Sequence, residues 1–174
     1  MTDTTVRALA LARPVINGLT ALNALYALGI VVLLACSFVR ADWLWTALGI
    51  GADVAHPAPA VGLRAIMVIG LVGAAIVHTI LRRLRAIVDT VRDSDPFITD
   101  NARRLQAIAW SVLAIEGLRL MVAAVAHAVS TPTHPIDMGE GFSFAPWLAV
   151  LLLFVLAGVF AQGARMREDL EGTV

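Results

Sequence analysis

The chain has 174 residues, of which 59% are hydrophobic and only 15% charged, and its 13 basic side chains are balanced by 13 acidic ones. Soluble domains of this length carry about 25% charged residues, so the composition excludes a water-soluble globular protein. The single cysteine, Cys36, excludes an intrachain disulfide and a cysteine-based metal cluster, and the balanced charge by itself indicates no partner.

The hydrophobic residues fall into four long blocks, and each block predicts one membrane-spanning helix. An α-helix rises about 1.5 Å per residue, so about 20 apolar residues cross a hydrocarbon core about 30 Å thick. We therefore predict an all-α fold, an integral membrane four-helix bundle of two hairpins in one domain over residues 1–174. The blocks place the spans at about 15–39, 61–81, 105–129 and 142–164.

The first span carries the amides Asn17 and Asn23, with Thr20 between them on the same helical face. Amide side chains in lipid form hydrogen bonds across helices. We therefore expect this face to contact other helices, and a ligand site is the alternative. The loop after the span, 40–60, contains tryptophans typical of the membrane interface, together with glycines and prolines that interrupt helices.

The second helix is expected to continue past the membrane to Arg92, because an apolar stripe continues there at three- and four-residue intervals. On the polar side of this extension, Arg85 and Asp89 are spaced for an i,i+4 ion pair. The stripe needs an apolar cover, either from within the protein or from a partner. The candidate docking residues are Leu84, Val88, Val91 and, after the break at 94–96, Phe97.

The interval 82–104 is the longest polar segment and contains six arginines. If the N-terminal arm, this interval and the C-terminal tail lie on one side, that side collects ten arginines and leaves Arg40 and Arg64 on the other. Arginine-rich short segments stay in the cytoplasm, so both termini and this loop are predicted to be cytoplasmic. Its aspartates make the loop too mixed for direct nucleic-acid binding, and contact with anionic lipid headgroups explains it better.

Glu116 and Arg119 interrupt the third span near its middle. An isolated charge there costs roughly 3 kcal/mol on insertion scales, and the i,i+3 spacing lets the two side chains pair. A structural pair, hydrogen-bonded to Asn17, Asn23 or Gln162, is one interpretation. The other is a proton- or ligand-sensitive switch, or a polar path through a small transporter or channel subunit.

The histidines raise the question of a metal or haem site. His78 and His127 fall near opposite ends of their spans, at depths that differ by roughly 20 Å, so they cannot share one metal. On the outer side, His56, His127 and His134 have carboxylates nearby in sequence and are weak candidates for a zinc or pH-sensing site. Their spacing matches no compact motif. Since nucleotide-binding and catalytic motifs are also absent from the sequence, we expect neither a cofactor nor enzymatic activity.

Two stretches carry a family resemblance: DPFITDNARRLQAIAW at 95–110 and VFAQGARMREDLEGTV at 159–174. With four spans in this order, they resemble the bacterial membrane family of domain of unknown function 2975. The resemblance brings no catalytic residues and implies a bacterial inner membrane location. Because members are often encoded beside small helix-turn-helix regulators, it also implies a cytoplasmic regulator of that kind as a partner.

The leading hypothesis is therefore a regulatory or interaction protein that signals through its cytoplasmic loop and contacts the lipid bilayer. A small transporter or channel subunit with a polar path at Glu116 and Arg119 is the first alternative. An outer-face metal-binding membrane protein is the second. Assembly as a homo-oligomer is compatible with all three.

Overall fold

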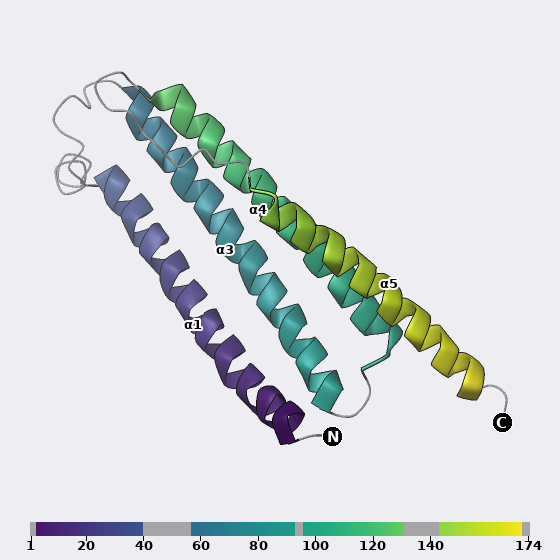
Figure 1. Cartoon of the computed structure of the whole chain (residues 1–174). Coiled ribbons are helices and arrows are strands. Elements are labelled where there is room, and N and C mark those ends of the chain that lie inside the picture. The colour runs from purple at the N-terminus through teal and green to yellow at the C-terminus, as the bar shows by residue number, and fades with distance from the viewer. Residues whose placement is uncertain (1–2, 40–56, 93–95, 131–142, 172–174) are drawn as a thin grey trace. The chain divides into compact units, whose positions relative to one another are not determined.

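The computed structural model describes residues 3–39, 57–92, 96–130 and 143–171, and all of its regular structure there is helical (Figure 1). The all-α prediction is therefore confirmed. The helices are α1 (Asp3–Val39), α3 (Pro57–Arg92), α4 (Thr99–Val129) and α5 (Ala145–Glu171).

Each of the four helices is long and apolar enough to cross a membrane, over Leu11–Val39, Ala60–Arg92, Thr99–Val129 and Ala145–Leu170. Their surfaces expose large apolar side chains along their length, such as Leu25 (66% exposed), Phe38 (67%) and Leu152 (58%). Such a surface is stable where lipid replaces water as the solvent. The prediction of four helices able to cross a membrane is thus confirmed, and the chain is a multi-pass membrane protein.

The helices extend beyond the predicted spans. α3 continues to Arg92, as the apolar stripe predicted, and Pro96 lies outside the helices. α1 extends back to Asp3, so Pro14 lies inside it. α4 begins at Thr99, six residues before the predicted span. The reason is that hydropathy marks only the apolar part of a helix, whereas arginine and alanine extend it readily.

Contacts among the described residues group the chain into two units. The first unit comprises Met1–Leu22, Ile76–Ile115 and Ser143–Val174, and the second comprises Asn23–Ala75 and Glu116–Phe142. All of α5 belongs to the first unit, whereas α1, α3 and α4 each contribute residues to both. The two units are described separately below.

The first unit has an apolar core built by α3, α4 and α5. Its buried residues are Ile87, Leu105, Ile108 and Ala157, and the partly buried residues packed against them are Ile80, Val91, Val112, Leu153 and Phe160. An edge-on contact between Trp110 and Phe154, with ring centroids 5.4 Å apart, also joins α4 to α5. Segments of three helices are thus held together by side-chain packing.

The second unit packs through small residues. A Cβ atom at Gly62 of α3 would lie 2.5 Å from Val129 Cγ1 of α4, so only glycine fits there. Ala74 is buried, and its carbonyl oxygen accepts a hydrogen bond of 3.0 Å from Asn23 Nδ2 of α1. Small residues let helix backbones approach closely in a membrane, where polar side chains add bonds between helices. Asn23 therefore makes the inter-helix contact expected of it.

Candidate functional site

The turn between α3 and α4 is organised by Asn101, whose side chain is fully buried. Its Nδ2 donates to the Pro96 carbonyl oxygen at 2.9 Å and to Thr90 Oγ1 at 2.7 Å. Its Oδ1 accepts from Arg104 Nη1 at 2.8 Å. An amide has two N–H donors and one carbonyl acceptor, so each of its groups is bonded. One side chain thereby joins the end of α3, the turn and the start of α4.

Two arginines reinforce this junction from opposite sides. Arg83 Nη1 of α3 donates to the Ala107 carbonyl oxygen and to Ser111 Oγ of α4, both at 3.2 Å. In the other direction, Arg104 Nη1 of α4 donates to the Ala86 carbonyl oxygen of α3 at 3.5 Å. These residues were predicted only to set orientation and to contact lipid. Sequence reasoning missed their bonding role, because the acceptors belong to another helix and most of them are backbone carbonyls.

Phe97, in the turn, is positioned by α5. Its ring centroid lies 5.3 Å from that of Phe160, and the two rings are tilted by 41°. A Cβ atom at Gly163 would lie 2.8 Å from Phe97 Cδ1, so the ring occupies the space that a side chain there would need. The two stretches that carried the family resemblance are therefore in direct contact.

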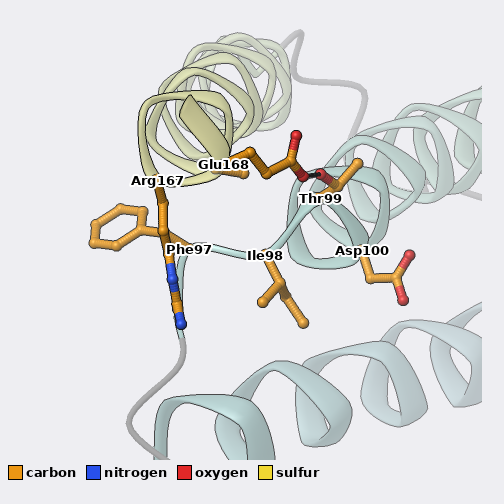
Figure 2. Close-up of a pocket in the computed structure, with 7 residues that line it drawn as sticks. Phe97, Ile98, Thr99, Asp100, Arg167 and Glu168 are labelled. Carbon is orange, nitrogen blue, oxygen red and sulfur yellow. Dashed lines mark hydrogen bonds between the residues drawn. The ribbon is translucent and has the colours of Figure 1, made fainter. Parts of the chain in front are cut away.

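Next to this contact lies an open hollow of about 470 Å³, which we call the motif hollow. Thr99 Oγ1 donates to Glu168 Oε1 at 3.3 Å across it, and Figure 2 shows these two side chains pointing toward one another. Asp100 and Arg167 point to opposite sides (Figure 2). The hollow is lined by Phe97, Ile98, Thr99 and Asp100 from the first stretch and by Ala164, Arg167 and Glu168 from the second.

The motif hollow combines apolar groups with three charged side chains, Asp100, Arg167 and Glu168, which we call the charged rim. Asp100 also lies 3.9 Å from Arg103, but these side chains are 65% and 77% exposed, so the pair contributes little to stability. No group of three or more histidine, cysteine or carboxylate side chains that could hold a metal occurs within the described residues. Apolar surface framed by charges of both signs is suited to binding another protein's side chains.

Glu116 and Arg119 form a bidentate ion pair within α4, which confirms the predicted pairing. Arg119 Nη2 lies 2.7 Å from Glu116 Oε1, and Nε donates to both carboxylate oxygens at 3.1 and 3.0 Å. The Glu116 side chain is 6% exposed and that of Arg119 41%. Asn17 accepts a bond from Arg85 and Asn23 donates to Ala74, so both amides are bonded elsewhere. The pair thus neutralises its charge within one helix.

The remaining candidates are placed as follows. Gln162 is exposed on α5 and His127 is exposed near the end of α4, whereas His56 and His134 lie outside the described residues. The outer metal site therefore stays a prediction. Among the docking candidates, Leu84 and Phe97 are exposed, whereas Val88 is partly buried and Val91 packs against the core.

Two details of the α3 extension differ from the prediction. Ile87, which the predicted stripe omitted, is buried in the core, because the face of α3 that meets α4 and α5 passes through Ile80, Ile87 and Val91. Asp89 pairs with Arg13 of α1 at 2.7 Å rather than with Arg85 on its own helix. A contact between helices has replaced the pair expected within one helix.

A further structural residue, Arg64, was counted only toward orientation. In the second unit its Nη2 donates to the Ser37 carbonyl oxygen at 2.6 Å, and its Nε donates to Ser37 Oγ at 3.3 Å. Its guanidinium carbon also lies 4.3 Å from the centre of the Phe38 ring. A cation is favourable at a helix C-terminus, so Arg64 caps the last turn of α1.

Comparison with known families agrees with these motifs. A family model described as "Protein of unknown function (DUF2975)" matches residues 5–174, including both stretches that line the motif hollow. Searches of curated proteins and of solved structures found no match. The chain is a membrane protein with four apolar helices, and it belongs to the DUF2975 family of proteins of unknown function.

Proposed function

We propose that this protein is a non-catalytic regulatory or interaction protein of the bacterial inner membrane, which binds a cytoplasmic partner protein at the motif hollow. The observation that carries the proposal is that the two stretches with the family resemblance, 95–110 and 159–174, meet at one surface. The partner class is a small helix-turn-helix regulator, as the family resemblance implies.

Exposed apolar side chains in the two stretches that form the motif hollow support a binding role. Phe97 is 44% exposed, and farther along α5 Met166 and Leu170 are 57% and 72% exposed. Met166 and Leu170 follow the predicted fourth span, 142–164, in a segment that is rich in charged residues. Covering apolar surface is favourable by roughly 25 cal/mol per Å². A partner helix that buries these side chains would gain affinity from them.

The charged rim supports selectivity. Asp100, Arg167 and Glu168 present both signs of charge beside the apolar groups. Complementary charges orient a partner and reject partners that place like charges in contact. The ten-to-two distribution of arginines supports a cytoplasmic position for this surface.

Co-purification with variants of the full-length protein tests the proposal. The tagged chain is solubilised in detergent, proteins that co-purify are identified, and each is tested for loss with Arg167→Glu and with Asp100→Arg. Charge reversal at the rim is expected to remove the partner while the melting temperature of the membrane protein stays near that of the wild type. Arg165→Glu is the matched control, since Arg165 is an exposed arginine of α5 that does not line the motif hollow.

One outcome of the co-purification supports docking at the motif hollow, and another contradicts it. Loss of a helix-turn-helix protein with the rim variants, but not with Arg165→Glu, supports the proposal. If folded Arg167→Glu and Asp100→Arg proteins retain every co-purifying protein, the motif hollow is not the docking site.

A further inference from the structure

A second polar surface lies where α3 meets α1 within the first unit. On α3, Arg82, Arg85 and Asp89 recur at three- and four-residue intervals, which places them on one helical face. Arg85 Nη1 donates to Asn17 Oδ1 of α1 at 3.3 Å, and Asp89 Oδ1 accepts from Arg13 Nε of α1 at 2.8 Å. This face of α3 therefore lies beside α1, although α3 packs its apolar core residues against α4 and α5.

Positive charge dominates this surface. It contains the three arginines Arg13, Arg82 and Arg85 and one carboxylate, Asp89, which is engaged by Arg13. Arg85 has a single hydrogen bond to a neutral amide. Arg82 is exposed and has no hydrogen bond or ion pair with any described residue. Two guanidinium groups thus remain without a compensating anion in the described part of the chain.

The position of Arg82 and Arg85 relative to the apolar part of the helices limits which anion can neutralise their charge. Arg85 is bonded to Asn17, which belongs to the predicted first span, and its neighbour Arg83 is bonded to Ala107 and Ser111 of the predicted third span. Arg82 therefore lies at the edge of the apolar region rather than in open water. An exposed guanidinium is costly in hydrocarbon, so a long arginine side chain at this depth is expected to extend to the headgroup layer, where the acceptors are phosphate oxygens.

We propose that Arg82 and Arg85 bind a phosphate group, supplied by the headgroup of an anionic phospholipid, beside α1. The planar guanidinium places two N–H groups at the spacing of two phosphate oxygens, and charge assistance strengthens these bonds. Arg13 neutralises Asp89, so the one carboxylate of this surface does not repel the phosphate. The site is independent of the motif hollow and of the partner proposed to bind there.

Thermal unfolding of the purified full-length protein tests this site. Phosphatidylglycerol is titrated into detergent-solubilised protein, with phosphatidylcholine as the zwitterionic lipid and inorganic phosphate as the soluble anion. We expect a saturable rise in melting temperature with phosphatidylglycerol and none with the other two. Arg82→Gln/Arg85→Gln should weaken the apparent affinity by on the order of 30-fold, since each of the two arginines near a membrane surface contributes attraction of about 1 kcal/mol and about 1.4 kcal/mol corresponds to tenfold.

Arg103→Gln/Arg165→Gln is the matched control, because it removes the same charge from exposed positions of α4 and α5. Arg82→Gln alone keeps the bond between Arg85 and Asn17, and so tests the site if the double variant fails to fold. Equal losses in the control and the site variants would show general charge attraction and overturn the proposal. A full response to inorganic phosphate, with no further effect of phosphatidylglycerol, would overturn the assignment to a lipid.

Discussion

At the scale of single residues, the two stretches that carry the family resemblance, 95–110 and 159–174, have a structural role. The buried Asn101 bonds the end of α3, the turn at Pro96 and the start of α4 through one amide. Leaving a buried polar group without its partner costs about 1–3 kcal/mol, so these bonds hold Pro96 and the two helix ends together. Phe97 and Thr99 are presented to α5 by that turn. The motif hollow thus depends on a residue that does not line it.

Gly163 provides a direct test of the contact between the two stretches. Gly163→Ala should destabilise the protein by about 1–3 kcal/mol, because the new Cβ atom displaces the Phe97 ring from Phe160. Gly158→Ala on the same helix is the control: a Cβ atom there meets nothing within 4 Å, and alanine favours the helix by up to about 1 kcal/mol. Thermal melts in detergent compare the two variants. A Gly163→Ala protein as stable as Gly158→Ala would show that Phe97 is not held against α5.

At the scale of helices, hydropathy predicted which segments span the membrane, but not how they are joined. Apolar blocks are local signals, so four helices and the extension of α3 to Arg92 could be predicted. The contacts made by Arg83, Arg64 and Arg13 link residues 24, 27 and 76 positions apart, to carbonyl or carboxylate oxygens of other helices. No spacing rule along the chain relates such partners. For the same reason the motif hollow could not be predicted, although the two stretches that form it were identified.

The ion pair between Glu116 and Arg119 in α4 leads to a prediction about stability. Glu116→Gln leaves Arg119 without its counter-charge inside an apolar segment, and Arg119→Met leaves Glu116 likewise unpaired. Each single change should lower stability by about 3 kcal/mol, whereas the double change should cost less, because removing both partners leaves no isolated charge. Melts of the three variants in detergent form a double-mutant cycle. Additive losses would show that each residue has another partner, and would favour a polar path through the protein.

At the scale of the whole molecule, orientation connects the helices to the proposed functions. The ten arginines of the N-terminal arm, the 82–104 interval and the tail predict that these segments are cytoplasmic. The partner-binding proposal requires this orientation, since a cytoplasmic regulator cannot reach an outward-facing motif hollow. The phospholipid site requires only that Arg82 and Arg85 lie near headgroups, which either orientation allows. A measurement of topology therefore bears on one proposal and not on the other.

Cysteine labelling in intact cells makes that measurement. Single cysteines are introduced at Ser94, Gly172 or Thr133 in a Cys36→Ser background, and the cells are treated with a membrane-impermeant thiol reagent. We expect Thr133→Cys to react in intact cells, and Ser94→Cys and Gly172→Cys to react only after lysis, because the lipid bilayer separates the reagent from the arginine-rich side. Labelling of all three after lysis is the control for accessibility. Reaction at Ser94→Cys before lysis would show that the orientation is the reverse of the predicted one, and would exclude a cytoplasmic partner at the motif hollow. The phospholipid site would then face the opposite leaflet, where the same lipid titration tests it.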